Sequence, residues 1–191
     1  MNQFDKAYFK VMAVEGGYIK DKDDPGGETY KGISRVFNPA WVGWQVVDSY
    51  KGRADFPGCL NNDLNLQSLV RYLYKKKYWD PYLGDQLDGS IAEEMFDQAV
   101  NLGLGKALEN LQKSLNILNR NQKDYPDIKV DGSFGDTTLK TYQIAVRLKG
   151  TRLLFNVLNF YQGAHYLKLM ETNSVREKYI GWFNRIEIKR N

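Results

Sequence analysis

The sequence predicts a mainly α protein with a short β-hairpin near residues 20–34. Apolar side chains recur at helical spacing over most of the chain, which is typical of amphipathic helices. Turn-forming residues gather in one segment instead, KDKDDPGGETYKGIS, and this segment cannot form regular helix. At 191 residues, the chain is long enough for one generous domain or for two small segments that share a core.

In the first half, apolar spacing predicts a helix over residues 3–15, which ends at Gly16-Gly17. The hairpin follows, with its turn at Asp24-Pro25-Gly26-Gly27. Residues 35–62 are of mixed character, and a second helix begins at Leu66 and runs to about residue 77.

In the second half, a helix over residues 91–99 is followed by a break at residues 101–105 and a continuation to Leu118. Asp131-Gly132 indicates a turn, and Asp136 is a candidate N-cap for the next helix. Further helices are expected around residues 154–161 and 180–186. Because no Ser- or Pro-rich linker and no internal repeat is present, we expect the two halves to pack as one body, with a seam near residues 84–92.

The chain contains one cysteine, Cys59, and one histidine, His165. A single cysteine excludes an internal disulfide framework. Zinc sites draw three or four ligands mostly from these two residue types, so the composition disfavours such a site. A Cys–His nucleophilic dyad would need Cys59 and His165 themselves. We therefore expect hydrolytic chemistry that uses carboxyl groups, with no metal and no cofactor.

The charge is unevenly distributed. Residues 1–95 hold 12 basic and 14 acidic side chains, whereas residues 96–191 hold 15 basic and 9 acidic ones. A basic second half suggests an anionic partner such as a cell-wall polymer, a membrane surface or nucleic acid, although a solvated helical surface has the same composition. No Gly-rich phosphate loop or dense arginine patch supports nucleic acid, which we do not expect as a partner.

Charged residues interrupt the first 14 positions, so the sequence has no apolar signal-peptide core. No apolar run is long enough to span a bilayer, so no integral membrane segment is expected. We expect the protein to be made in the cytoplasm without a signal peptide, so that action in the periplasm or cell wall would require release or export. The oligomeric state is left open.

Three side chains near the hairpin are candidates for catalysis. The apolar face Phe4–Tyr8–Val11 points, one turn later, at Glu15, where desolvation and the negative end of the helix dipole favour a protonated carboxyl. Asp24 lies in a polar turn that favours the ionised form, and the Thr29 hydroxyl could position a water molecule. Two carboxyl groups separated by environment are what glycoside hydrolysis requires, but a solvated glutamate and an ordinary turn have the same spacing.

The motifs EGGY (residues 15–18), DPGGET (24–29) and GIS (32–34) resemble those of the glycoside hydrolase family 108 N-acetylmuramidases. This family comprises lysozyme-like phage endolysins and bacterial relatives, some of them called secretion activator proteins. The resemblance continues in YWDP (78–81), FDQAVNLG (96–103), DGSFGDTT (131–138) and GWFNR (181–185), the last two in the family's predicted peptidoglycan-binding region.

The resemblance implies a lysozyme-like fold, with a catalytic segment at residues 1–90 and a helical peptidoglycan-binding segment at residues 91–191. It implies cleavage of the β-1,4 bond between N-acetylmuramic acid and N-acetylglucosamine, with Glu15 as the catalytic acid and peptidoglycan as partner. Thr29 lies one residue nearer to Asp24 than the threonine does in the Glu–Asp–Thr arrangement of phage-type lysozymes. By count along the chain, Tyr30 occupies the position of that threonine.

Seven further residues are candidates for substrate binding. Tyr18, Tyr30 and Trp79 could stack on sugar faces or pack in the core. Asp97 and Asn101 share one helix face; Asp97 either accepts hydrogen bonds from sugar or pairs with a basic residue as an anchor between helices. Gly26 and Gly27 complete the set.

Two other functions remain open from the sequence. One is a wall-binding or secretion-assisting protein with little or no turnover. The other is a lytic transglycosylase, which keeps the acid but forms an anhydro product. Inversion and retention also remain open, because they depend on the distance between the carboxyl groups.

Overall fold

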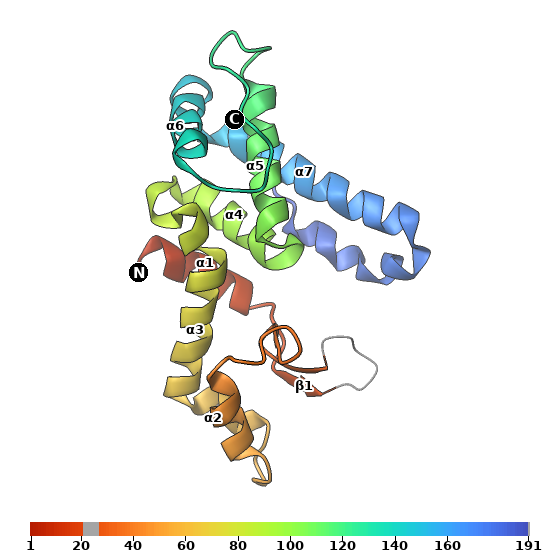
Figure 1. Cartoon of the computed structure of the whole chain (residues 1–191). Coiled ribbons are helices and arrows are strands. Elements are labelled where there is room, and N and C mark those ends of the chain that lie inside the picture. The colour runs from red at the N-terminus through yellow and green to blue at the C-terminus, as the bar shows by residue number, and fades with distance from the viewer. Residues whose placement is uncertain (21–26, 191) are drawn as a thin grey trace. The chain divides into compact units, whose positions relative to one another are not determined.

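The computed structural model describes residues 1–20 and 27–190 (Figure 1). The chain divides into two compact units, residues 1–77 and residues 78–191. The first unit contains the helices α1 (Gln3–Met12), α2 (Gly43–Tyr50), η1 (Gly58–Asn62, a 3₁₀ helix) and α3 (Leu64–Tyr78, which ends at the boundary), and the strands β1 (Tyr18–Lys20), β2 (Glu28–Tyr30) and β3 (Ile33–Ser34).

The predicted hairpin is confirmed and is extended by a third strand. β1 pairs antiparallel with β2, and β2 pairs antiparallel with β3, so that Thr29 faces both Ile19 and Ser34 in the register. Lys31 and Gly32 form the tight β2–β3 turn, in which both have positive φ.

Part of the core of the first unit forms where the apolar face of α1 packs on α3. The Tyr8 ring lies edge-on to the Tyr74 ring, with centroids 5.9 Å apart. Beside these rings the Arg71 guanidinium of α3 pairs with Asp5 of α1 and lies 5.0 Å from the centroid of Phe4. Buried apolar contacts and a flanking ion pair therefore hold α1 against α3.

The second unit is a helical body. It contains the 3₁₀ helices η2 (Asp80–Tyr82), η3 (Gly84–Gln86) and η4 (Ser174–Arg185), and the α-helices α4 (Gly89–Leu102), α5 (Leu104–Leu118), α6 (Asp136–Lys149) and α7 (Thr151–Thr172). α4, α5 and α7 pack on one another, α6 lies beside α5 and α7, and η4 runs back along α7 (Figure 1).

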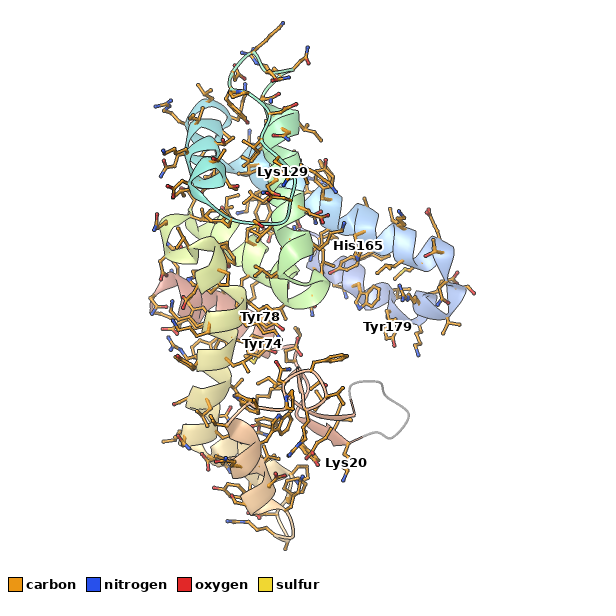
Figure 2. The ribbon with its side chains drawn as sticks, in the orientation of Figure 1. Lys20, Tyr74, Tyr78, Lys129, His165 and Tyr179 are labelled. Atoms are coloured by element: carbon orange, nitrogen blue, oxygen red, sulfur yellow. The ribbon has the colours of Figure 1, made fainter. Side chains whose placement is uncertain are left out.

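Two details of the predicted helices are wrong. Gly135 rather than Asp136 occupies the N-cap of α6, and Asp136 is the first helical residue. The segment predicted as a helix around residues 180–186 is the 3₁₀ helix η4, which has a kink at Tyr179 (Figure 2). The break predicted at residues 101–105 is confirmed, because Gly103 has a φ of 87° between α4 and α5.

Buried amide side chains fix the relative positions of the central helices. Gln98 of α4 is fully buried; its Nε2 donates to Glu94 Oε1 (2.8 Å) and to the Leu158 carbonyl of α7 (3.1 Å). Its Oε1 accepts a bond from Asn110 of α5 (2.8 Å). One side chain thus satisfies polar groups on three helices.

The predicted turn at Asp131-Gly132 is confirmed, and Gln112 of α5 holds it. Gln112 Oε1 accepts from the N–H groups of Asp131 (3.0 Å) and Gly132 (2.9 Å). Its Nε2 donates to Asp131 Oδ1 (3.0 Å) and to the Ser133 carbonyl (2.9 Å). The motif DGSFG is therefore a structural turn bound to α5.

Candidate active site

Glu15 lies in a bend beyond α1, so the predicted helix over residues 3–15 is wrong at its end. The Ala13 N–H donates to the Phe9 carbonyl (3.0 Å), and the Val14 N–H donates to the Val11 carbonyl (3.1 Å), which tightens the last turn. Glu15 consequently leaves the apolar stripe of α1. Its side chain is half-buried all the same.

The Glu15 carboxylate reaches the turn between β2 and β3. A Cβ atom added to Gly32 would lie 2.9 Å from Glu15 Oε2 and 2.6 Å from the Tyr74 hydroxyl oxygen. The carboxylate therefore lies close against the backbone of Gly32. The hydroxyl of Tyr74, a residue of α3 that is labelled in Figure 2, approaches the same turn.

Backbone hydrogen bonds hold this turn in place. The Lys31 N–H donates to the Gly17 carbonyl (3.1 Å), two residues after Glu15. The Lys31 carbonyl accepts a bond from the Tyr74 hydroxyl (2.8 Å), and Lys31 Nζ donates to Gln67 Oε1 (2.6 Å). Burial lowers the pKa of Lys31. The sequence does not mark Gly32 and Tyr74 as site residues. Gly32 stands in the GIS motif without a role, and Tyr74 has only the i, i+4 spacing with Leu66 and Val70 on the buried face of α3.

The other candidates in the hairpin are placed only in part. Asp24 and Gly26 lie outside the described residues. Gly27 directly precedes β2 and has a φ of 60°. Thr29 is the half-buried central residue of β2.

Tyr18 belongs to an ion-pair cluster around Glu28, a residue to which the sequence pattern gives no role. The Tyr18 hydroxyl donates to Glu28 Oε1 (2.8 Å), and the Tyr18 ring meets Phe56 edge-on at 4.8 Å. The Glu28 carboxylate also pairs with Lys51 (2.7 Å) and Arg35 (2.8 Å). The cluster links β2 to α2, because Arg35 and Lys51 also pair with Asp48 of α2.

Acid is expected to weaken this cluster. Burial would raise the pKa of Glu28, but hydrogen bonds from Lys51 and Tyr18 and the charge of Arg35 outweigh it and lower the pKa. Hydrogen bonds from Arg35 and Lys51 lower the pKa of Asp48 to about 2. Both carboxyl groups thus contribute stability that is complete above their unfolded-state pKa of about 4 and is lost as the pH falls through their folded-state values.

We therefore expect the melting temperature to fall between pH values of about 4 and about 2, and Arg35→Gln to reduce that fall. Arg53→Gln is the matched control, because its partner Asp55 lies in a more exposed ion pair. Equal pH dependence in the wild type and in Arg35→Gln would contradict a stabilising role of the cluster.

Tyr30 and Trp79 are core residues, which is the alternative that the sequence left open. Tyr30 is 1% exposed; its hydroxyl donates to the Leu60 carbonyl (3.2 Å) and accepts from Gln67 Nε2 (2.9 Å). Trp79 is 0% exposed, and its Nε1 donates to Asp85 Oδ1 (3.1 Å). Neither ring presents a face to solvent on which a sugar could stack.

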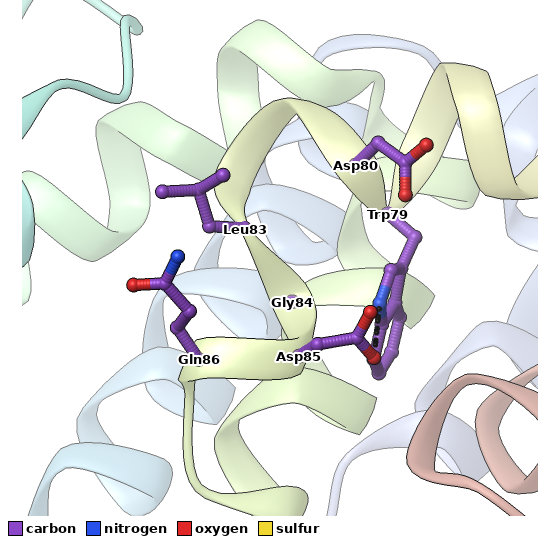
Figure 3. Close-up of a pocket in the computed structure, with 6 residues that line it drawn as sticks. All are labelled: Trp79, Asp80, Leu83, Gly84, Asp85 and Gln86. Carbon is purple, nitrogen blue, oxygen red and sulfur yellow. Dashed lines mark hydrogen bonds between the residues drawn. The ribbon is translucent and has the colours of Figure 1, made fainter.

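A small pocket of about 190 Å³ lies beside Trp79 (Figure 3). Its lining is formed by Trp79, Asp80, Leu83, Gly84, Asp85 and Gln86. Ligand pockets usually begin at about 300 Å³, so this one is too small for a disaccharide. A larger apolar groove of about 410 Å³ between residues 40–42 and α3 contains none of the candidate residues.

Asp97 joins three elements of the second unit. Its carboxylate accepts bonds from Arg185 of η4 (2.7 Å) and Gln162 of α7 (2.8 Å), and it also accepts a longer one (3.2 Å) from Asn101. These contacts match the alternative of an anchor between helices. Asn101 is exposed and donates mainly to the Asp97 carbonyl (2.7 Å).

Asp97→Asn is expected to lower the unfolding free energy by about 1–2 kcal/mol, because Arg185 loses a part-buried charged partner. Thermal melting measures this, with Glu171→Gln as a control that removes an exposed carboxylate from α7. Unchanged stability together with weaker peptidoglycan binding would instead support a role in recognising sugar.

The described residues, 1–20 and 27–190, include no group of three His, Cys, Asp or Glu side chains arranged to hold a metal ion. Over the same residues, no helix has the length and apolar character needed to cross a membrane.

Comparisons with known proteins agree with the motifs. The model for glycosyl hydrolase 108 matches residues 8–103, and the model described as a predicted peptidoglycan domain matches residues 106–187. Among solved structures, the chain is similar to SagA from Brucella abortus. The two are 27% identical with a TM-score of 0.61, over 96% of this chain and 88% of that chain. This likeness confirms the mainly α, lysozyme-like fold.

No curated protein matches the chain. The predicted seam near residues 84–92 lies between the boundary of the compact units at residues 77–78 and the gap between the two matched regions at residues 103–106. The glycosyl hydrolase 108 model matches residues 8–103, which is half of the chain. The chain therefore belongs to the glycosyl hydrolase 108 family and is a glycosidase.

Proposed function

We propose that the protein is an N-acetylmuramidase, which cleaves the β-1,4 bond between N-acetylmuramic acid and N-acetylglucosamine with Glu15 as general acid. Membership of the family, together with the C-terminal region, supports a peptidoglycan hydrolase. The observation that carries the role of Glu15 is the placement of its half-buried carboxylate against the backbone of Gly32.

The surroundings of Glu15 suit an acid. Partial burial disfavours the charged form, and the negative end of the α1 dipole, which lies just before Glu15, acts in the same direction. A protonated Glu15 would donate its proton to the glycosidic oxygen as the oxocarbenium-like transition state develops. In this proposal Asp24 stabilises that charge or helps to place water, and Thr29 assists.

Mass spectrometry of the muropeptides released from purified peptidoglycan tests the bond specificity. We expect new reducing ends on N-acetylmuramic acid. Reducing ends on N-acetylglucosamine, or anhydro products, would overturn the muramidase assignment and would indicate a glucosaminidase or a lytic transglycosylase. Sedimentation with peptidoglycan without any release of fragments would indicate a binding protein.

Chelation with EDTA is expected to leave the rate unchanged within error. One cysteine and one histidine cannot supply the usual ligands of a zinc site, so the reaction would use carboxyl groups alone. The measurement is the initial rate of lysis of permeabilised cells with and without EDTA, using a zinc-dependent amidase as the positive control. Loss of activity that zinc restores would contradict the proposal.

We also propose that the protein acts in the periplasm or cell wall after release or export, because peptidoglycan is found there. Fractionation of producing cells tests this, and a protein retained entirely in the cytoplasm during wall degradation would contradict it.

A further inference from the structure

We propose that Gly32 and Tyr74 are positioning residues for the Glu15 carboxyl group. The inference rests on the proposed function, in which Glu15 is the acid, and adds to it the two residues that determine where the acid lies. It depends on the contacts among the end of α1, the β2–β3 turn and α3.

Gly32 leaves space that every other residue type would fill. Its φ is +74°, and an added Cβ would lie 2.6 Å from the Tyr74 hydroxyl and 2.9 Å from Glu15 Oε2. Both distances are shorter than real Cβ contacts, so a side chain at position 32 must displace one of the two groups. Gly32 is itself exposed, so the carboxylate lies over a part of the turn that substrate can approach.

Tyr74 gives this turn a fixed neighbour. Its side chain is 2% exposed, and its ring is held edge-on against Tyr8 of α1. Its hydroxyl donates to the Lys31 carbonyl (2.8 Å), and the Lys31 N–H in turn donates to Gly17 (3.1 Å). The turn is therefore tied on one side to α3 and on the other side to the chain that follows Glu15.

A general acid must lie within hydrogen-bond reach of the glycosidic oxygen. Displacement of a catalytic group by about 1 Å can cost about 100-fold in rate. The clash at position 32 requires a movement that the buried and hydrogen-bonded Tyr74 resists, so Glu15 is the group expected to move.

Gly32→Ala tests the proposal, with Gly52→Ala as matched control. Gly52 also has a left-handed backbone (φ +92°), but no atom lies within 4 Å of its added Cβ. Both variants carry the backbone strain and should melt about 2–4 °C lower. Only Gly32→Ala should lose kcat, about 100-fold, with KM unchanged. Equal kcat values in the two variants would overturn the proposal.

Tyr74→Phe provides a second test that does not strain the backbone. We expect kcat to fall about tenfold, whereas Tyr72→Phe, two residues along α3 and 62% exposed, should match the wild type. The double variant Gly32→Ala/Tyr74→Phe should recover part of the kcat lost in Gly32→Ala, because removal of the hydroxyl makes room for the methyl group. Wild-type kcat in Tyr74→Phe, or no recovery in the double variant, would contradict the proposal.

The Glu15→Gln variant distinguishes a failure of the proposed function from a failure of the positioning inference. If Glu15→Gln keeps the wild-type kcat, Glu15 is not the acid and both proposals fall. If Glu15→Gln is inactive while Gly32→Ala equals Gly52→Ala, only the positioning inference fails.

Discussion

Glu15→Gln is expected to lower kcat on peptidoglycan about 10²–10⁴-fold, which is the usual contribution of a general acid. Glutamine has nearly the same shape as glutamate but carries no transferable acidic proton. Binding of peptidoglycan should persist, because sedimentation with the insoluble wall does not require proton transfer. The release of reducing ends, measured as an initial rate, gives the size of the loss.

Glu177→Gln is the matched control, because it makes the same chemical change at an exposed position of η4. It should retain the wild-type rate. The half-buried setting of Glu15 means that its replacement should not unfold the protein, and thermal melting of both variants checks this. A wild-type rate in Glu15→Gln would remove Glu15 from its proposed role.

Trp79→Ala is expected to lower the unfolding free energy by about 3–5 kcal/mol, the range for truncating a buried aromatic side chain. The indole is fully buried, lies 5.9 Å from the Tyr82 and Phe96 rings, and donates to Asp85. Thermal or urea unfolding measures the loss.

Tyr72→Ala is the control for Trp79→Ala, because it truncates an aromatic side chain that is 62% exposed. Its effect on stability should be small. If Trp79→Ala kept the wild-type stability and instead weakened binding of peptidoglycan, the interpretation of Trp79 as a core residue would be wrong and sugar stacking would be favoured.

The sequence was enough to predict most helices and the hairpin, because apolar spacing and turn-forming residues determine the backbone conformation of the few residues around them. The end of α1 shows where that information stops. The helical spacing of the apolar face, extended by one turn beyond Val11, reaches Glu15, but hydrogen bonds from Ala13 and Val14 close the helix early. Which of several equivalent helix ends the chain adopts depends on contacts outside the helix.

The motifs identified Glu15 as the acid, but they gave no role to Gly32, which lies in the GIS motif, and they do not include Tyr74. Gly32 and Tyr74 are 17 and 59 residues away along the chain, and only the folded turn brings them to the carboxylate. The aromatic residues were candidates for which the sequence could not separate two roles, because the same residue types serve sugar binding and core packing. Burial of Tyr30 and Trp79 favours core packing, and burial is a property of the tertiary structure.

The pairing of Gln112 with the Asp131–Ser133 turn has a consequence for which substitutions the family can tolerate. The side-chain amide offers two N–H donors and one carbonyl to the loop, as a neighbouring peptide strand would. Glutamate cannot supply the donors, lysine cannot supply the acceptor, and asparagine is one methylene too short. Sequence variation among relatives that keep this turn should therefore be almost absent at position 112, while the solvent-facing positions of α5 vary freely.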